Sequence, residues 1–410
     1  MRVLFTLTPG NGSLHPLVPL AHALVRAGHA VCFACASSFR PEVEKHGFQT
    51  QSVGIDFLFS RPDYFSILLA EAGIDMPGPA HLTGHQRHAW VTNNLFIGAA
   101  AMRALPDVCA LAESWAADVI VRESSEYSGC VAAEVLGLPH ASVAAAADAA
   151  LDLRDLTADA LAPLRAAAGL PPDPRAEMLY RHLHLSFMPP SFFGPEARFP
   201  ATERFLRHVD APRPGVTAPD WWDRLPDRPT VLVSLGTIFF RTPGLYETIV
   251  AGFGQEDLNV VVGIGHDREP RSAALESTPA PANLHVEPYL PIPELLRECA
   301  LFVTHGGFNS IKEAAAAGTP MLVVPIASDQ HYSAERAEAI GIARAVRPDE
   351  RRPELIREHA LAVLADRSCR DRAAALASEM AALPPIEHAV HMLQQLARAP
   401  DEHAPAASTA

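Results

Sequence analysis

Short runs of apolar residues alternate, in the first half of the chain, with longer segments whose apolar residues recur at helical spacing. The runs of strand length cover residues 2–8, 29–36, 48–54, 118–124 and 138–147. The segments with helical periodicity cover residues 17–29, 39–47, 99–117 and 128–136. Strands that alternate with helices in this way predict a parallel sheet covered by helices.

The same alternation starts again at residue 230. Strand-like runs cover residues 230–237, 258–265, 284–291, 300–304 and 320–325, and helical segments cover residues 293–299, 310–318, 357–364 and 369–383. Residues 210–229 are rich in proline and have no apolar period, which indicates a linker. We therefore predict two α/β domains, residues 1–209 and 230–385, and a disordered tail at residues 399–410.

The acidic composition narrows the range of functions. The formal net charge is −14, which argues against a nucleic-acid-binding surface. The six cysteines have no disulfide-like spacing, and the N-terminus leads directly into a strand without a signal peptide, so we expect a cytoplasmic protein. No apolar run reaches the length of a transmembrane helix, so we expect no membrane insertion.

Two local patterns resemble redox or metal sites. Cys32 and Cys35 form a CxxC pattern inside the second strand, where an odd spacing places them on opposite faces and predicts core cysteines. His81, His85 and His88 share helical spacing, but no acidic or cysteine partner lies nearby. We therefore interpret them as a solvated or acceptor-facing helix and predict no metal site.

Residues 305–330 combine a glycine loop, an alanine-rich helix and a second loop. A strand that turns through Gly306 and Gly307 into a helix leaves the first N–H groups of that helix unpaired at the positive end of the macrodipole. Such a helix start binds anions. His305 can donate from its ring, and Asn309 and Ser310 can donate near the helix start. This stretch therefore indicates a phosphate site, although a simple tight turn would also satisfy the pattern.

Further polar residues fall at the same edge of the predicted sheet. Glu313 lies one turn beyond the helix start and could accept hydrogen bonds from a ribose diol, while Asp329 and Gln330 suit sugar hydroxyls unless they are solvated loop residues. The exit loop of the strand at residues 230–237 faces the same edge by topology. It carries Ser234, Gly236 and Thr237.

This stretch resembles the donor-binding signature of nucleotide-sugar-dependent glycosyltransferases of the GT-B class, family 1. In plant-type members the box contains HCGWNS, a glutamate three residues later, and a terminal acidic residue followed by Gln. Here the box reads HGGFNS, with Gly306 and Phe308 in place of Cys and Trp as in bacterial members. The matching positions are His305, Gly307, Asn309, Ser310, Glu313, Asp329 and Gln330. The sequence LVPLAHAL after the first loop is similar to bacterial natural-product (macrolide and antibiotic) members.

The resemblance implies the GT-B fold, with two Rossmann-like, doubly wound parallel-sheet domains that face each other across a cleft. The first domain would bind the acceptor and the second the donor, and residues 386–398 would form a terminal helix that crosses back to the first domain. Tyr289, followed by Leu290, takes the place of an aromatic residue that packs on the nucleotide base. Gly12, in the loop after the first strand, is also assigned to donor binding.

The implied activity is an inverting transfer of a sugar from a dTDP- or UDP-sugar to a small, lipophilic natural product. The sugar would move by direct displacement at the anomeric carbon while the two domains close. No cofactor and no metal are expected, because the helix start with His305, Ser310 and Thr237 would stabilise the leaving diphosphate. The expected partners are the nucleotide sugar and the aglycone, with a homodimer as a further option and no nucleic acid.

The chain departs from the family where a general base is needed. The usual base is a His in a GHxxP loop, oriented by an Asp after the fourth strand; here Ser13 and Glu123 stand at those positions. A serine hydroxyl cannot act as a general base without help from another group. His15 on the same loop could take the proton, Asp148 could take it, or an acidic phenol or carboxylic acid could need little help. Alternatively, Glu123 is a buried carboxylate paired with Arg122 or with a backbone donor.

The irregular segment at residues 56–91 is rich in large apolar residues. It is interpreted either as loose core packing or as the wall of a lipophilic acceptor pocket. The candidate acceptor-binding residues are Phe57, Phe59, Phe65 and Trp90. Three other functions remain open: a catalytically silent nucleotide-sugar-binding partner, a transferase directed to carbon or phenol with an atypical base, and a nucleotide-sugar epimerase of similar fold.

Overall fold

The computed structural model describes residues 1–75, 78, 82, 84–147, 153–237, 242–254, 256–265 and 283–398. The chain forms two compact units, Met1–Pro212 with Leu383–Ala410, and Arg213–Ala382. The second unit therefore includes residues 213–229, which belong to the stretch predicted as a linker. The predicted disordered tail at residues 399–410 lies outside the described residues.

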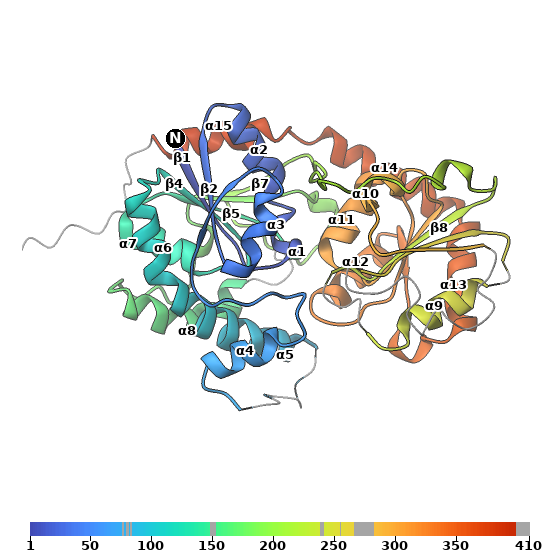
Figure 1. The fold of residues 1–410 in the computed structure, drawn as a ribbon, viewed down its shortest axis with the longest axis horizontal. Helices are drawn as coiled ribbons and strands as arrows, with labels where there is room; N and C mark the ends of the chain where they lie inside the picture. The colour runs from blue at the N-terminus through green and yellow to red at the C-terminus, as the bar shows by residue number, and fades with distance from the viewer. Residues whose placement is uncertain are drawn as a thin grey trace, which may run out of the picture. The chain divides into compact units, whose positions relative to one another are not determined.

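The first unit is built on a seven-stranded sheet in the order β3-β2-β1-β4-β5-β6-β7, and all of its pairings are parallel (Figure 1). The strands are β1 (Arg2–Thr6), β2 (Ala30–Cys35), β3 (Gln49–Ser52), β4 (Val119–Glu123), β5 (His140–Val143), β6 (Leu183–Ser186) and β7 (Glu203–Phe205). The parallel sheet and its first five strands agree with the sequence prediction. The chain reverses direction across the sheet between β1 and β4, which makes the fold doubly wound.

Helices cover both faces of this sheet. They are α1 (Asn11–Leu14), α2 (Val18–Arg26), α3 (Arg40–Glu44), α4 (Tyr64–Glu71), α5 (Gly84–Val91), the π-helix η2 (Thr92–Ala101), α6 (Met102–Ser114), α7 (Ser128–Leu136), α8 (Leu153–Ala167) and α15 (Glu387–Leu396). Short 3₁₀ turns lie at Ser37–Phe39, Glu177–Tyr180 and Pro190–Phe192. The terminal helix α15 packs beside α2 and belongs to the first unit (Figure 1).

Successive side chains along each strand point to opposite faces of the sheet, so the core of the first unit consists of two clusters. Phe5 packs in the cluster that includes α2 and α15, whereas Leu4 packs in the cluster that includes α6 and α7. Cys35 belongs to the first cluster and Cys32 to the second, which confirms that the two thiols lie on opposite faces. Burial raises the pKa of Cys32 to about 11 and that of Cys35 to about 12, so both are structural thiols.

The helix predicted at residues 99–117 is longer than expected, because α5, η2 and α6 follow one another without a break. Its segment Gln86–Ser114 is long and apolar enough, by length and composition, to cross a membrane, and 39% of its apolar window is buried in the fold. The expectation that no apolar run reaches this length was therefore wrong. Core helices of soluble proteins meet the same criterion, and here η2 and α6 supply residues to the core.

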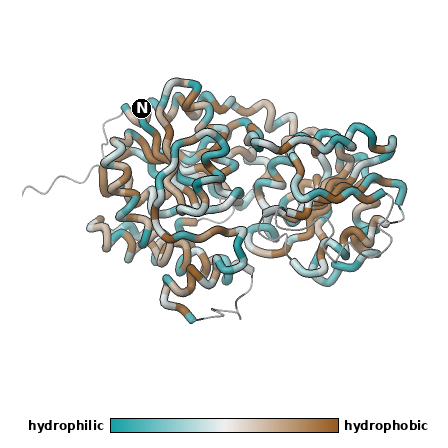
Figure 2. The backbone as a smooth tube through the Cα atoms, viewed as in Figure 1, coloured by the Kyte–Doolittle hydropathy of each residue, from teal (hydrophilic) through white to brown (hydrophobic). Residues whose placement is uncertain are grey.

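The second unit contains a six-stranded sheet in the order β10-β9-β8-β11-β12-β13, again parallel throughout. The strands are β8 (Thr230–Ser234), β9 (Asn259–Gly263), β10 (Leu284–Glu287), β11 (Leu301–Thr304), β12 (Met321–Val323) and β13 (Ala343–Ala345). The helices are α9 (Leu245–Phe253), α10 (Ile292–Leu296), α11 (Phe308–Ala317), α12 (Gln330–Ala339), α13 (Pro353–Ala365) and α14 (Arg367–Ala382), with 3₁₀ turns at Trp222–Arg224 and Pro348–Glu350. Figure 2 shows the hydrophobic residues concentrated along these strands.

The proline-rich segment is held on the second unit by its two tryptophans. The Trp221 ring stacks on His285 with 4.5 Å between centroids, and its indole N–H donates to Glu287 at 2.8 Å. The indole N–H of Trp222 donates to Glu298 at 2.9 Å.

In each unit the strand order reverses at one place, between β1 and β4 in the first and between β8 and β11 in the second. Open α/β sheets bind ligands at the carboxyl ends of the strands beside such a reversal. Candidate functional residues are therefore expected just after β1, β4, β8 and β11.

Candidate active site

Three buried polar side chains form a hydrogen-bonded chain at the carboxyl ends of β1 and β4. The hydroxyl of Thr8 donates to Oε1 of Glu123 at 2.6 Å and lies 2.7 Å from the hydroxyl of Ser13. The exposed fractions are 7% for Thr8, 8% for Ser13 and 0% for Glu123. The structure therefore joins Ser13 and Glu123, the two positions at which the sequence departs from the family pattern that it resembles. Sequence reasoning missed Thr8, although its place directly after β1 at the reversal point could have indicated it.

Glu123 is held by donors around both of its carboxylate oxygens. Oε2 accepts from the main-chain N–H of Ser125 at 2.8 Å, and Oε1 also accepts from the N–H of Thr8 at 3.4 Å. Burial raises the pKa of the Glu123 carboxyl, while the hydrogen bonds from Thr8 and Ser125 act in the opposite direction. The carboxylate is therefore more basic than an ordinary glutamate.

Arg122 does not donate to the Glu123 carboxylate. Its guanidinium instead donates to the carbonyl oxygens of Glu123, Ser124, Glu126 and Leu179 at 2.7 to 3.3 Å. The alternative in which Glu123 pairs with Arg122 was therefore wrong, whereas pairing with backbone donors is present. Neighbouring strand residues point to opposite faces, which accounts for the separation.

The other predicted residues of the first loop lie close in sequence to Ser13. Gly12 lies within α1, and half-buried His15 follows that helix directly. Asp148, the alternative base, lies outside the described residues. The role of His15 and that of Asp148 therefore remain predictions.

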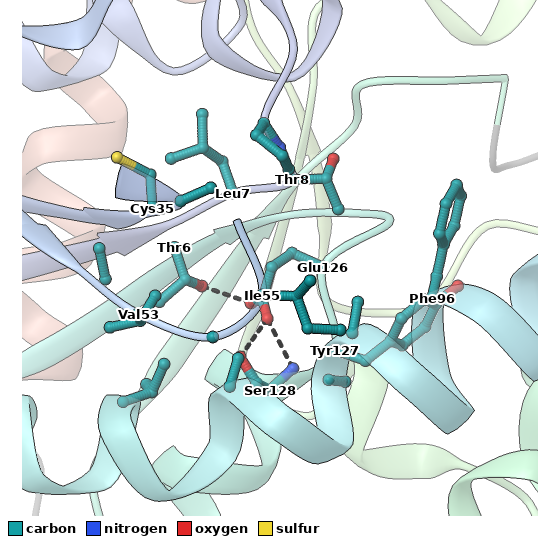
Figure 3. Close-up of a pocket in the computed structure, with 18 of the residues that line it drawn as sticks. Thr6, Leu7, Thr8, Cys35, Val53, Ile55, Phe96, Glu126, Tyr127 and Ser128 are labelled. Atoms are coloured by element: carbon teal, nitrogen blue, oxygen red, sulfur yellow. Dashed lines mark hydrogen bonds between the residues drawn. The ribbon is translucent and has the colours of Figure 1, made fainter. Parts of the chain in front are cut away.

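A second buried carboxylate, Glu126, was not predicted from the sequence. Its Oε2 accepts from the Thr6 hydroxyl at 2.5 Å and from the N–H of Gly129 at 2.9 Å. Its Oε1 accepts from the N–H of Ser128 at 2.6 Å and from the hydroxyl of the same residue. Glu126 thus caps the start of α7 and ties it to β1 (Figure 3).

A cavity of about 40 Å³ lies at this edge of the first sheet, between the end of β1 and the π-helix (Figure 3). Its lining includes Thr8, Glu126, Phe57 and Phe96. A volume of this size has room for about two or three waters. The cavity therefore lies beside the aromatic segment, with Phe57 and Phe96 in its lining.

The four predicted acceptor residues gather in one apolar cluster. The cluster contains Phe57, Phe59, Phe65 and Trp90, with Leu68, Leu69, Leu95 and Phe96 among its other members. Phe57 lines the small cavity and is 3% exposed, while the other three predicted residues are half-buried. The segment thus packs as a satellite core that keeps part of its aromatic surface accessible. Phe96, which lines the cavity from the π-helix, was missed because it lies beyond the segment considered.

The predicted metal pattern cannot be assembled from the described part of the chain. His81 and the side chain of His85 lie outside it. Among the residues that the structure describes, no group of three or more His, Cys, Asp or Glu side chains is placed to hold a metal ion.

In the second unit, the His305 ring is enclosed by two glycines. A β-carbon on Gly236 would lie 2.5 Å from Cε1 of His305, and one on Gly307 would lie 2.5 Å from its Nε2. Only glycine fits this approach, and Gly236 also has a positive φ of 74°. Burial lowers the pKa of His305 to about 4, so the imidazole is neutral at pH 7 and has one N–H to donate.

The ring stands beside the start of α11, which begins at Phe308 after Gly307 at the N-cap. The N-cap residue Gly307 makes no side-chain cap hydrogen bond, so it leaves room for an anion at this helix start, and the phosphate contact remains a prediction. Asn309 is half-buried, and its Oδ1 accepts from buried Lys312 at 2.9 Å. That contact uses the carbonyl end of the Asn309 side chain. Ser310, half-buried, completes the first turn.

Glu313 is paired with a residue that sequence reasoning missed. Nη2 of Arg213 donates to Oε1 of Glu313 at 2.8 Å, and the two side chains are 9% and 10% exposed. Nη1 of Arg213 lies 3.4 Å from the carbonyl oxygen of Leu290. Arg213 belongs to the proline-rich stretch read as a linker, which gave no signal for this pairing. The ion pair leaves Glu313 with one carboxylate oxygen for the predicted ribose contact.

Asp329 and Gln330 follow β12 at the same edge of the second sheet, with Asp329 at the N-cap of α12. Oε1 of Gln330 accepts from the N–H groups of Ile326 and Ala327 at 2.8 and 3.0 Å. The carbonyl end of the Gln330 amide therefore shapes the loop, and only its N–H₂ end remains for a sugar hydroxyl. Asp329 is half-buried, and its contact with a sugar hydroxyl remains a prediction.

The remaining donor residues border the same reversal point. Ser234 pairs with Thr304 across β8 and β11, and its hydroxyl lies 3.4 Å from the N–H of Gly236. Thr237 and Tyr289 are half-buried, and their contacts with the donor remain predictions. Leu290 is 2% exposed and packs beside Gly263, so its side chain is a core residue.

Two doubly wound parallel sheets, each with polar residues gathered at its reversal point, define the GT-B class of glycosyltransferases. The glycosyltransferase VinC, solved in complex with dTDP, is 26% identical to this chain, and the match covers 97% of this chain and 99% of VinC with a TM-score of 0.77. The glycosyltransferase SnogD from Streptomyces nogalater has the same fold, with a TM-score of 0.75 at 24% identity over 97% of this chain and 99% of SnogD.

The family models for the N-terminal and C-terminal domains of erythromycin biosynthesis protein CIII-like proteins match residues 22–236 and 247–396. The chain belongs to this family of natural-product glycosyltransferases. The L-demethylnoviosyl transferase of Streptomyces niveus is 31% identical over 83% of this chain and 84% of its own. The 4'-demethylrebeccamycin synthase of Lentzea aerocolonigenes is 29% identical over 96% of this chain and 99% of its own. The predicted fold class, family and enzyme class are thereby confirmed.

Proposed function

We propose that this glycosyltransferase moves a sugar from a dTDP- or UDP-sugar to a lipophilic natural product, with inversion at the anomeric carbon. The observation that carries the proposal is the neutral His305 ring, which is enclosed by Gly236 and Gly307 beside the start of α11. This arrangement presents several uncharged donors at one place, which suits a diphosphate. The dTDP complex of VinC supports the same class of donor.

Each donor-side residue has a part in this scheme. The N–H groups of α11 and the His305 ring hold the diphosphate, with the hydroxyls of Thr237 and Ser310 as further donors. Asp329 and the N–H₂ end of Gln330 contact sugar hydroxyls. Tyr289 packs on the nucleotide base. As the bond between the anomeric carbon and the diphosphate breaks, the growing negative charge is met by these donors, so the residues themselves supply the stabilisation that other sugar transferases take from a cation.

The acceptor is bound by the first unit in this proposal. The partly exposed aromatic surface of Phe59, Phe65 and Trp90 suits a flat, apolar aglycone. One direct displacement at the anomeric carbon inverts its configuration. The acceptor hydroxyl must then lose its proton. The candidate bases are the two that the sequence suggests, His15 and Asp148, and the chain formed by Ser13, Thr8 and Glu123.

The direct test is to incubate the purified protein with dTDP- and UDP-sugars and a panel of aromatic and polyketide acceptors, and to analyse the products by mass spectrometry. We expect an acceptor that gains the mass of one glycosyl residue, with unchanged turnover after treatment with a chelator. Binding of the nucleoside diphosphate without turnover of any pair would favour the silent partner instead. Absence of nucleotide binding in calorimetry would refute the proposal.

A further inference from the structure

The direction of hydrogen bonding in the chain Ser13–Thr8–Glu123 is fixed by proton counting. The Thr8 hydroxyl has one proton, and it is donated to the Glu123 carboxylate at 2.6 Å. The contact of 2.7 Å between Thr8 and Ser13 must then use the proton of Ser13. As a result, the remaining lone pairs of the Ser13 oxygen are acceptors, directed away from Thr8. A protonated Glu123 would reverse every bond in the chain. The three groups therefore form a path that can carry one proton.

The outer end of this path lies next to the apolar segment of the first unit. Phe59 donates its main-chain N–H to the carbonyl oxygen of Pro9 at 3.1 Å. Its ring packs so closely on Gly10 that a β-carbon on Gly10 would lie 2.7 Å from Cδ2 of Phe59. Pro9 and Gly10 connect Thr8 to α1, which carries Ser13. An acceptor that rests on the aromatic cluster is therefore next to the loop that holds the Ser13 hydroxyl.

We propose that Ser13, Thr8 and Glu123 form a proton relay that replaces the missing histidine, with Glu123 as the final base for the acceptor hydroxyl. The proposal rests on the proposed function, because it needs a nucleotide-sugar donor and a hydroxyl acceptor. It makes Ser13 a catalytic residue that touches the acceptor, and it makes Thr8 and Glu123 part of the same unit.

The transfer balances without any further reactant. The acceptor oxygen forms a bond to the anomeric carbon, and the bond from that carbon to the diphosphate breaks with its electron pair on the leaving group. The acceptor proton passes to the Ser13 oxygen, the Ser13 proton passes to Thr8, and the Thr8 proton passes to Oε1 of Glu123. The product state contains a neutral carboxylic acid in a fully buried position, which burial favours over the carboxylate.

The first unit contains a second threonine–glutamate pair, Thr6 and Glu126, which serves as a control for Thr8 and Glu123 because Ser13 is not part of it. Thr6 donates to Glu126 two residues before Thr8 donates to Glu123, and both carboxylates are buried. The partners of Glu126, however, are Thr6, Ser128 and Gly129, which fix the start of α7. A substitution of Thr6 therefore removes the same kind of hydrogen bond without interrupting the relay.

The test compares Thr8→Val, Thr8→Ser and Thr6→Val in the full-length protein with an unactivated alcohol acceptor. Thr8→Val keeps the shape of the side chain but cannot pass a proton, so we expect kcat to fall by about 100-fold or more while KM for the donor changes less than about threefold. Thr8→Ser restores a hydroxyl, and we expect it to recover most of the rate. Thr6→Val should lower thermal stability about as much as Thr8→Val but leave kcat within about threefold of the wild type.

Solvent isotope effects give a readout that a structural role would not move. If several protons move in the same step, a plot of the wild-type rate against the deuterium fraction in mixtures of H₂O and D₂O should bow below a straight line. This curvature should vanish in Thr8→Val. A Thr8→Val enzyme that is as fast as the wild type, or a Thr8→Ser enzyme as slow as Thr8→Val, would overturn the relay. Both experiments require that the wild-type protein transfers a sugar. If it transfers none from any nucleotide sugar, the proposed function is refuted instead of the relay.

Discussion

A β-carbon on Gly236 would stand 2.5 Å from Cε1 of His305, so the two residues fit only because Gly236 has no side chain. Gly236 follows β8 and His305 follows β11, neighbouring strands at the reversal point of the second sheet. The close approach fixes the imidazole in a dry environment, where its pKa falls to about 4. A neutral, immobile ring donates one hydrogen bond in a defined direction, which is the property that a diphosphate site requires.

The first prediction is that nucleotide binding depends on this ring. His305→Ala removes a hydrogen bond to a charged diphosphate and should weaken binding of dTDP or UDP by about 1.5 to 3 kcal/mol. Isothermal titration calorimetry measures the difference directly. Gly236→Ala keeps the imidazole but displaces it, and we expect it to weaken binding as well. An unchanged affinity in His305→Ala would remove the diphosphate assignment of this loop.

The second prediction concerns acid sensitivity. The pKa of His305 is about 4 in the folded state and about 6.5 when exposed, so the unfolded chain takes up the proton first as the pH falls. The stabilisation that comes from keeping this ring neutral is complete above pH 6.5 and is lost progressively toward pH 4. Between pH 7 and pH 5 it accounts for about 2 kcal/mol.

Chemical denaturation at pH 7 and pH 5 checks this value when the wild type is compared with His305→Asn. The asparagine does not titrate, so the variant should lose about 2 kcal/mol less than the wild type over this interval. His140 and His184 are also buried with lowered pKa values, and they contribute equally to both proteins. Identical losses in the two proteins would contradict the assignment of a neutral, buried His305.

The fold could be predicted because its signal is local. Apolar runs of strand length and helical periodicity indicate their own elements, and alternation of the two types is enough to specify a parallel sheet. The strands that were missed, β6, β7 and β13, read LHLS, ERF and ARA, so polar residues interrupt each apolar run. The equally short β12 was found because it lies in the apolar run PMLVVP. The residues assigned to the phosphate site could be proposed from the sequence because they lie in one continuous stretch around His305, and their role remains a prediction.

The remaining site residues act through contacts between distant parts of the chain. Thr8 and Glu123 are separated by 115 residues, and Arg213 and Glu313 by 100. The place of Thr8 after β1 indicates an edge position, but nothing in its neighbouring sequence identifies Glu123 as its partner, and nothing near Arg213 identifies Glu313. The prolines around Arg213 also misled the prediction. A proline-rich stretch without an apolar period is typical of a linker, but here the stretch packs on the second unit through Trp221 and Trp222.

The third prediction follows from the ion pair of Arg213 and Glu313, whose side chains are 9% and 10% exposed. Arg213→Met leaves a buried carboxylate without its cation and should destabilise the protein by about 3 kcal/mol. Adding Glu313→Gln to Arg213→Met should recover a large part of this loss, because no charge is then buried. Urea denaturation of the two single variants and the double variant gives the coupling energy.

A matched control is available in the same unit. Arg367 and Asp371 form an exposed pair at 3.9 Å, with side chains that are 88% and 71% exposed. Asp371→Asn should change the free energy of unfolding by less than about 0.5 kcal/mol. If Arg213→Met cost no more than this control, the pair would be a surface contact, and Arg213 would have no part in holding Glu313 at the donor site.

The last prediction ranks the three groups that could accept the proton of the acceptor. His15→Ala, Asp148→Asn and Thr8→Val each remove one of them, and positioned acid–base catalysis is worth roughly 100-fold to 10,000-fold. We expect Thr8→Val to lower kcat the most with an alcohol acceptor, because Ser13, Thr8 and Glu123 are already hydrogen-bonded to one another and buried. A phenol ionises without help, so the penalty for Thr8→Val should shrink to about tenfold or less with a nitrophenol acceptor. A loss that is as large for the phenol as for the alcohol would mean that Thr8 shapes the loop instead of passing a proton. If His15→Ala were instead the slowest variant with the alcohol and lost its defect with the phenol, the imidazole would be the base, and Ser13 would only leave room for it.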